Sequence, residues 1–480
     1  MTMMSLAQQD ANTFRLAWFA RAWAIAVWLH LAAEPRGAWA TQPPLAVLSV
    51  LLALAAARAF LAPRDRRAVL ALCVLLPLHA WAEAPVVGNH WVLAALVSLS
   101  FCLDAVRRFL LPSSSFMPGE LVRSARLTLL IAYAFAAFAK LNWDFLNPAV
   151  SCAVFYQDQL VRSWNLPDLS VASVPVLGRS LAVLTVVIEL AVASLLAFSR
   201  TRRFGLVLAF GFHWMLALDL EQHFWDFSSV LFAGFLLFLD DGQVAWLRQQ
   251  FGAWPKWRPR PFFLPLLIGC LGAAIAVLNI LPLELGSAAT LQQWGHVAWW
   301  GYGTAWVGLI AASLFAPKLP SHRAYERHRV PAILLVPPIL AAFNGLTPYL
   351  EIKTGFGWNM YSNLKTVAGQ TNHLLLPGTW DLTGAQRELV QIVSSTDPAL
   401  QRLHDEDYGL TFSEFKNYAH RFPNSAVTYR WQERVHHAPR LGDDPVVQGS
   451  VNVAAQKLIS FRAVDLQAAQ RCQPNFSPAR

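Results

Sequence analysis

The chain has 480 residues, of which 55% are hydrophobic and only 14% are charged, and its formal net charge is +9. This composition is too apolar for an ordinary water-soluble domain, in which about 25% of residues are charged. The basic residues sit in short segments between apolar runs and do not form a stripe interleaved with exposed aromatic side chains, so nucleic-acid binding is not expected. The composition predicts a polytopic membrane protein.

Apolar runs long enough to cross a bilayer recur through the first 346 residues. A membrane helix needs about 20 predominantly apolar residues, and only helices or closed barrels satisfy their backbone groups in lipid. The sequence predicts about eleven helices, with about nine as the lower bound because the runs at 224–240 and 330–346 are short or contain prolines. The predicted spans are residues 14–33, 43–62, 68–87, 90–106, 125–141, 178–198, 204–221, 224–240, 262–283, 295–316 and 330–346.

The expected fold class is an all-α bundle of membrane helices followed by a small α+β soluble domain. After Gly345 the apolar runs shorten and turn-forming residues appear. Within this tail, residues 388–394 and 412–421 are predicted as short helices, the second capped by Thr411, and residues 426–430 and 458–461 as strands. The predicted organisation is an N-terminal segment at 1–13, a membrane domain at 14–346 and a soluble domain at 347–480.

Basic residues are concentrated in alternate loops between the predicted helices. Lysine and arginine are retained on the cytoplasmic side of a membrane, and the opposite loops hold little beyond Arg36, Arg162 and Arg179. The N-terminus is therefore predicted in the cytoplasm and the C-terminal domain outside it, in the periplasm if the membrane is a bacterial inner membrane. The arginine-rich loops span residues 64–67, 107–123, 200–203, 248–260 and 318–329.

The five cysteines follow this topology. Cys73, Cys102 and Cys270 fall within predicted helices, where a thiol usually behaves as a small apolar residue. Cys152 and Cys472 are both predicted outside, where disulfides persist, so a bridge between them is one option and two separate thiols are the other. No pair of cysteines has the spacing of a zinc site, and no metal is predicted.

Ionisable residues inside predicted spans are the first candidates for function, because a charge in lipid is costly. Taken singly, a histidine or lysine at a helix end is most often an interfacial anchor. Glu189 lies deeper and needs a partner or water, and His213 is suggested as that partner. Whether the histidines share one pocket stays open. Those near the predicted outer ends are His30, His79, His90, Lys140, Asp219, His223 and His296.

The segment 135–146 is the most informative one in the chain, because a lysine closes an apolar run and an aromatic stretch follows it. Here the chain resembles the vitamin K-dependent γ-carboxylases and their bacterial relatives, the HTTM domain proteins. In that family a Lys-Leu-acidic-x-Asp run ends a helix, and its lysine, which Lys140 matches, is regarded as the base. Residues 212–227 and 355–363 are similar to two further family segments, so the resemblance runs from about residue 14 to 376.

The resemblance implies an enzyme that couples oxidation of a reduced, vitamin K-like quinone to carboxylation of a glutamate-like carbon acid, with O2 and CO2 as co-substrates. Lys140 would take the quinol proton, since an amine in a desolvated pocket can act as a base, and His213 would stabilise the oxyanion. The expected partners are membrane lipid, a quinone and a peptide or protein substrate. Candidates for the pocket are Asn142, Asp144, Glu189, Asp219, Trp358 and Asn359.

Two departures from the family pattern keep other interpretations open. Asn142 and Asn359 stand where the family has acidic residues, and the tail is shorter than that of the animal carboxylases. The two asparagines favour a protein of the same fold that binds a quinone or lipid without carboxylation and recruits partners through its tail. The shorter tail argues against propeptide-directed carboxylation of a secreted protein. A transporter is the third interpretation, but the sequence shows no duplicated halves. Without the resemblance, Lys140 is an interfacial anchor and His213 a buried structural histidine.

Overall fold

A computed structural model describes residues 3–33, 42–85, 87–112, 116–252, 288–317, 330–449 and 452–472. Within them the chain is mostly helical, with a small sheet region in its C-terminal part. It divides into two compact units. Unit 1 comprises residues 1–82, 90–132 and 190–341, and unit 2 comprises residues 83–89, 133–189 and 342–480. The predicted span at 262–283, with Cys270, lies outside the described residues.

The described helices of the first 346 residues vary widely in length. Several are too short to cross a bilayer alone: α9 has 15 residues, α10 has 13 and α14 has 11. The helices are α1 (Met3–Ala33), α3 (Pro43–Leu61), α4 (Arg66–Glu83), α5 (Asn89–Leu110), α6 (Pro118–Ala139), α7 (Cys152–Ser163), α8 (Pro175–Ala197), α9 (Arg202–Leu216), α10 (Phe224–Leu236), α11 (Asp241–Gly252), α13 (Ala288–Ala312) and α14 (Val336–Leu346), with short 3-10 helices η1 (Pro167–Leu169), η2 (Ser313–Phe315) and η4 (Ala332–Leu335).

Four of the described helices are long and apolar enough to cross a membrane, and there are five such spans if α10 and α11 count as one. These two helices are bent by 107° at the break between them. Several long apolar helices support the prediction of a membrane protein, but about eleven spans are not confirmed. The four are Ala11–Ala33 within α1, and α3, α6 and α8.

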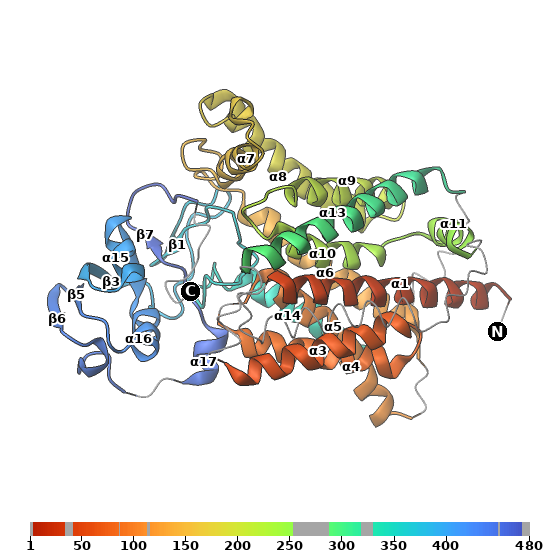
Figure 1. Ribbon diagram of the computed structural model, residues 1–480, viewed down its shortest axis with the longest axis horizontal. Coiled ribbons are helices and arrows are strands. Elements are labelled where there is room, and N and C mark those ends of the chain that lie inside the picture. The colour runs from red at the N-terminus through yellow and green to blue at the C-terminus, as the bar shows by residue number, and fades with distance from the viewer. Residues whose placement is uncertain are drawn as a thin grey trace. The chain divides into compact units, whose positions relative to one another are not determined.

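Helix α1 is the central helix of unit 1. It runs alongside α3 and α10 and also contacts α11 and α13 (Figure 1). In its most apolar stretch 83% of residues are buried, compared with 33% in α3. A helix that is apolar all round is expected in such a position. Helix α3 instead exposes Val47, Leu51 and Leu54, which form a face suited to lipid.

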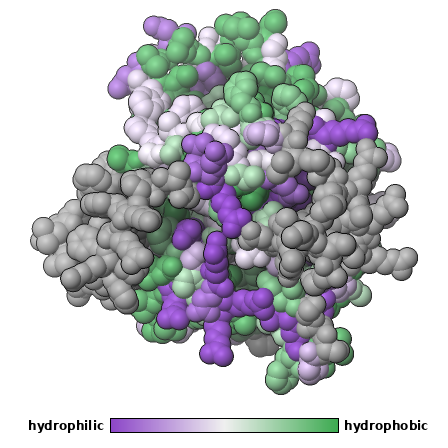
Figure 2. Space-filling model, turned by 90° about the vertical axis from the view of Figure 1, so that its right-hand side faces the viewer, coloured by the Kyte–Doolittle hydropathy of each residue, from purple (hydrophilic) through white to green (hydrophobic). Residues whose placement is uncertain are grey.

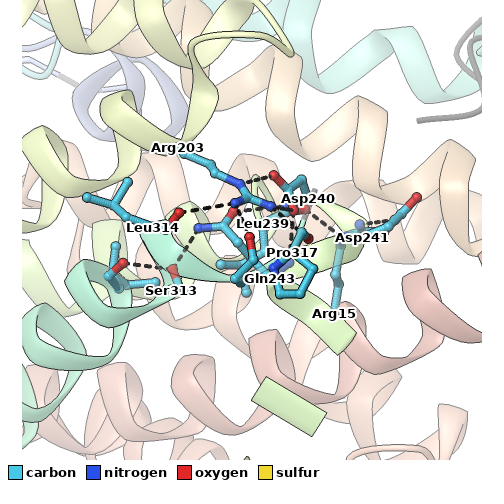
Figure 3. Close-up of polar contacts among 11 residues, drawn as sticks. Arg15, Arg203, Leu239, Asp240, Asp241, Gln243, Ser313, Leu314 and Pro317 are labelled. Atoms are coloured by element: carbon cyan, nitrogen blue, oxygen red, sulfur yellow. Dashed lines mark hydrogen bonds and ion pairs between the residues drawn. The ribbon is translucent and has the colours of Figure 1, made fainter. Parts of the chain in front are cut away.

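Two buried arginines fix the turn between α10 and α11 (Figure 3). Arg203 of α9 forms a two-pronged ion pair with Asp240, in which Nε lies 2.5 Å from Oδ2 and Nη2 lies 3.0 Å from Oδ1. Arg15 of α1 donates to the Leu239 carbonyl at 2.8 Å and pairs with Asp241. Carbonyls at a helix end have no partner within the helix, and Arg203 also donates to those of Leu314, Ala316 and Pro317.

The C-terminal part of unit 2 contains a five-stranded antiparallel sheet with the order β6-β5-β3-β4-β7. A single hydrophobic cluster joins the sheet to two helices, with Val390, Leu410 and Tyr429 packing against Leu400 and Phe415. The elements are β3 (Leu389–Ser395), α15 (Pro398–Asp405), β4 (Tyr408–Thr411), α16 (Phe412–Arg421), β5 (Val427–Trp431), β6 (Arg434–Ala438), η5 (Leu441–Asp443), α17 (Val453–Leu458) and β7 (Val464–Asp465), while β1 (Thr366–Val367) and β2 (Gln370–Thr371) pair separately.

Two of the four local predictions for this tail are confirmed and two are wrong. Helix α16 is present with Thr411 as its cap, and β5 matches the predicted strand at 426–430. Residues 388–394 are not a helix, because their alternating buried side chains place them in β3. Residues 458–461 are not a strand. Asn452 accepts hydrogen bonds from the backbone of Ala454 and Ala455 and caps α17. This helix ends at Leu458, inside the predicted strand.

Candidate functional site

Lys140 follows α6 directly, in a turn that tightens the end of the helix. Its backbone N–H donates to the carbonyl of Ala137 at 3.1 Å. Its side chain is buried, and Nζ lies 3.0 Å from Oε2 of Glu189 in α8 and 3.4 Å from the Ala136 carbonyl. Glu189 is buried as well. The partner that the structure gives Glu189 is thus Lys140, whereas the sequence suggested His213.

The Lys140–Glu189 ion pair is shielded by α6 itself. Tyr133, buried on the same helix seven residues before Lys140, lies close enough to Glu189 for an electrostatic interaction. Residues spaced by three or four positions share one face of a helix, so Tyr133 and Ala136 lie on one face of α6, and the Lys140 side chain folds back to the Ala136 carbonyl. The ion pair therefore lies against one face of an apolar helix.

Asn142 and Asp144 are engaged by the chain itself. Asn142 Nδ2 donates to the carbonyls of Ala139 at 2.8 Å and Ser362 at 2.5 Å. Asp144 Oδ2 accepts from Asn372 Nδ2 at 2.6 Å and from the Gln470 backbone at 2.9 Å. Both predicted pocket residues thus fasten the loop after Lys140 to distant segments of unit 2.

Trp358 and Asn359 lie in a tightly wound stretch of unit 2. Trp358 has a φ of 58°, and Phe356 and Tyr361 beside it also have positive φ. Residues other than glycine adopt this conformation rarely and only when their surroundings hold them there. The Trp358 backbone donates to Asn89 Oδ1 at 3.1 Å, and Asn359 Nδ2 donates to the Thr354 carbonyl at 3.1 Å. The Asn359 side chain thus binds the backbone of its own segment.

A disulfide joins Cys152 to Cys472, 320 positions apart in the sequence. Cys152 begins α7, and its backbone donates to Asn363 Oδ1 at 2.8 Å. The Cys472 backbone donates to the Val150 carbonyl at 3.2 Å. The bridge that the sequence left as one option is therefore present, and it ties the end of the described chain to the loop after α6.

A second buried polar group lies in unit 1, and we call it the histidine–aspartate cluster: His30, His79, His90 and Asp226. His30 Nδ1 and His90 Nε2 each lie 2.9 Å from Asp226 Oδ2. A carboxylate only accepts hydrogen bonds, so each of these ring nitrogens carries the hydrogen. Three helices, α1, α5 and α10, thus contribute one side chain each to the contact.

His79 joins the cluster through Trp91, whose ring stacks on that of His30 with a centroid distance of 3.7 Å. Trp91 Nε1 donates to His79 Nδ1 at 3.2 Å. The other nitrogen of His79 then carries the hydrogen and donates to Ser49 Oγ at 2.9 Å. The sequence left open whether the histidines near the predicted outer helix ends share a pocket. His30, His79 and His90 do come together in unit 1.

The histidine–aspartate cluster is also the described set best suited to a metal ion within unit 1. Ligand atoms of His30, His90 and Asp226 all lie within 4.8 Å of one another, and two imidazoles with one carboxylate suit divalent transition metals. The same ligand atoms already bond one another, since His30 Nδ1 and His90 Nε2 both donate to Asp226 Oδ2. The second carboxylate oxygen, Asp226 Oδ1, is buried without a hydrogen-bond partner among the described residues.

His213 and Asp219 belong to unit 1. His213 is buried in α9, and the ring of Phe227 lies 5.3 Å from that of His213 and 5.9 Å from that of His90. Asp219 Oδ1 accepts from the backbone of Glu221 and Gln222 at 2.9 and 3.2 Å, which shapes the turn after α9. Of the predicted site residues, the structure brings Lys140 to Glu189 and links Asn142 to Asp144 through Asn372.

Asp226 was missed as a site residue by the sequence reasoning. The sequence nevertheless indicates it, because an acidic residue within the apolar run 224–236 costs free energy unless it is paired. Its partners lie 136 and 196 positions away in the sequence. A single sequence offers no means of pairing residues so far apart.

No protein-family model matches the chain, and comparison with curated proteins and with solved structures gives no match either. Fold and site define a helical membrane protein with a folded C-terminal segment and two buried polar groups, the Lys140–Glu189 ion pair and the histidine–aspartate cluster. Its chemistry has to be inferred from its own residues.

Proposed function

We propose that the chain is an integral membrane protein of the vitamin K-dependent γ-carboxylase (HTTM) kind, in which a reduced quinone loses a proton to the Lys140–Glu189 ion pair. The observation that carries this proposal is the pair itself, with a lysine and a carboxylate buried 3.0 Å apart at the end of an apolar helix. When bound, the quinone supplies an acidic hydroxyl and reducing equivalents, and O2 and CO2 are the co-substrates for carboxylation of a glutamate-like carbon acid.

Removal of a hydroxyl proton requires a base and a positive charge beside the resulting oxyanion, and the ion pair supplies both. The Glu189 carboxylate can take the proton, while the Lys140 ammonium stays beside the oxyanion and stabilises it. Alternatively, Lys140 passes its own proton to Glu189 and takes the hydroxyl proton as the free amine. Both routes end with one more proton on the pair.

The proposed orientation has the N-terminus in the cytoplasm and the C-terminal segment in the periplasm of a bacterial inner membrane. The arginine-rich alternate loops support it. The disulfide between Cys152 and Cys472 supports it independently, because such bridges persist in oxidising compartments. Both cysteines belong to regions that the charge distribution assigns to the outside.

A second function is favoured by Asn142 and Asn359. Both side chains donate to backbone carbonyls, at positions where the carboxylases carry acidic groups. A protein of this fold that binds a quinone or lipid without turning it over, and recruits partners through its tail, accounts for that difference.

Turnover of a reduced naphthoquinone by the full-length protein in detergent tests the first function against the second. We expect epoxide formation by the wild type, a loss of about a hundredfold or more in Lys140→Met and in Glu189→Gln, and unchanged turnover in the control Lys416→Met. Wild-type protein that binds the quinone without turnover would support the binding function. Full turnover in Lys140→Met would remove the ion pair from the mechanism.

A further inference from the structure

We propose that unit 1 binds the phosphate group of an anionic membrane lipid in a cavity lined by arginines. The cavity has a volume of about 150 Å³ and lies where the start of α1, the starts of α4 and α6 and the end of α5 meet. Arg64, Arg66 and Arg108 line it together with Asp104, and the remaining walls are mostly apolar, including Leu16 and Phe116.

The lining carries an excess of positive charge. Three arginines and one aspartate give a net charge of +2, and that aspartate is already shared between two arginines. Asp104 accepts from Arg108 Nε at 2.9 Å and from Arg107 at 2.8 Å. Within the described ranges, Arg64 and Arg66 have no carboxylate partner. The cavity lining therefore carries a net positive charge that a phosphate would neutralise.

The ring of Phe116 holds two of these arginines toward the same space. The guanidinium of Arg66 lies 3.9 Å from the ring centroid and that of Arg108 lies 5.3 Å from it. Two like charges on one ring repel each other. An anion that accepts hydrogen bonds from both guanidinium groups removes this repulsion, and phosphate oxygens match their forked geometry.

The surroundings favour a lipid over free phosphate. The end of α5, which carries Arg108, exposes Phe109 by 84%, Leu110 by 65% and Leu111 just beyond it by 57%. Apolar side chains next to arginines are expected at the boundary between acyl chains and headgroups. Seen from the end that carries the start of α1, hydrophilic side chains form a band beside hydrophobic ones (Figure 2).

The proposal rests on residues of unit 1 and uses neither Lys140 nor Glu189. It therefore stands whether or not the chain turns over a quinone. Under the proposed orientation the cavity faces the cytoplasmic leaflet, where basic pockets between membrane helices bind anionic headgroups.

The test measures binding of dioctanoyl-phosphatidylglycerol, dioctanoyl-phosphatidylcholine and inorganic phosphate to full-length protein in a neutral detergent, by native mass spectrometry and by thermal shift. The wild type should bind phosphatidylglycerol about tenfold more tightly than phosphatidylcholine. The double variant Arg64→Gln/Arg66→Gln should lose about tenfold in that affinity. The matched control Arg58→Gln/Arg67→Gln removes the same charge from the same region outside the cavity lining and should lose less than about threefold.

Three results would overturn the proposal. Equal binding of the two lipids by the wild type removes the headgroup preference, and this comparison does not depend on the folding of any variant. Equal losses of phosphatidylglycerol affinity in the two double variants would show that the preference comes from general surface charge. Inorganic phosphate that binds as tightly as phosphatidylglycerol and displaces it assigns the cavity to a free anion.

Discussion

Buried charges are satisfied differently in the helical part of unit 1 and in the C-terminal part of unit 2. In unit 1, Asp226 depends on the side chains of His30 and His90, and Arg203 depends on Asp240 and on carbonyls at a helix end. Helices use their own N–H groups internally, so a carboxylate between helices must find a side chain from elsewhere.

In the C-terminal part of unit 2, backbone N–H groups bind the buried carboxylates of Glu351 and Glu414. Glu351, fully buried, accepts from the backbone of Ala368 at 2.9 Å and of Gly369 at 2.7 Å. Glu414 accepts from the Phe461 backbone at 2.8 Å. Irregular segments leave such groups free for this purpose. Within the described part of the chain, Asp226 thus depends on partner side chains alone, whereas Glu351 in the tail combines backbone donors with the side chains of Thr379 and Gln386.

The largest effect should come from removing the covalent tie of the tail. Replacing Cys152 and Cys472 by serine should lower the stability of unit 2 by about 4 kcal/mol, because the unfolded chain gains freedom. The measurement is the urea dependence of protease resistance, with and without a reducing agent. The control Cys102→Ser should behave as the wild type. A double variant as resistant as the wild type would show that backbone contacts alone hold the tail.

The next effect concerns pH and the tail alone. Burial raises the pKa of Glu414 from its ordinary 4.5 to about 7. Between these values the folded state binds more protons than the unfolded chain, so this group's contribution to stability falls as pH rises through 7, by on the order of 3 kcal/mol in total. Glu414→Gln should flatten the dependence of the urea midpoint on pH, whereas the exposed Glu433→Gln should keep it. Identical pH profiles in the two variants would contradict the burial argument.

A smaller effect tests the arginine network of unit 1. A Cβ atom on Gly242 would lie 2.0 Å from the Pro317 carbonyl oxygen and 2.8 Å from Arg203 Nη2. Gly242→Ala should therefore destabilise unit 1 by about 2 kcal/mol, as overpacking does. Gly301→Ala, where a Cβ meets nothing within 4 Å, is the matched control. The melting temperatures of the two variants are compared by thermal unfolding followed by tryptophan fluorescence. Equal melting temperatures would show that the turn between α10 and α11 can move to accommodate the extra methyl group.

The smallest effect is local to α16. Thr411 Oγ1 accepts from the Glu414 backbone and caps the helix, so Thr411→Ala should cost about 1 kcal/mol. Thr411→Ser keeps the oxygen and should recover most of the loss in the same urea titration. A serine variant as unstable as the alanine variant would assign the loss to the missing methyl group.

The sequence predicts those features that depend on neighbouring residues. Long apolar runs indicate α3 and α8, and Thr411 marks the start of α16. Residues 388–394 are misread as a helix because a short apolar segment fits both the helical and the strand periodicity until its burial is known. Lys140 stands out as a lone basic residue at an apolar helix end.

What the sequence does not reveal is the pairing of distant residues. Burying the carboxylates of Glu189 and Asp226 costs free energy unless each has a partner. The residues near them in the sequence do not indicate that Lys140 pairs with Glu189, or that His30 and His90 pair with Asp226. Asn142 is predicted as a pocket residue, yet its side chain binds carbonyls from residues 139 and 362. Function assigned from motif positions therefore needs the contacts as well as the spacing.

The most direct test of the proton-sharing role is quinol oxidation by the double variant Lys140→Met/Glu189→Leu. Removing both charges of a buried pair is nearly neutral for stability, whereas removing one costs about 3 to 5 kcal/mol, so the double variant should be folded and yet inactive. We predict wild-type thermal stability with no detectable oxidation of the reduced naphthoquinone. A double variant that oxidises the quinol at the wild-type rate would contradict the account and leave the ion pair a structural feature of α6 and α8.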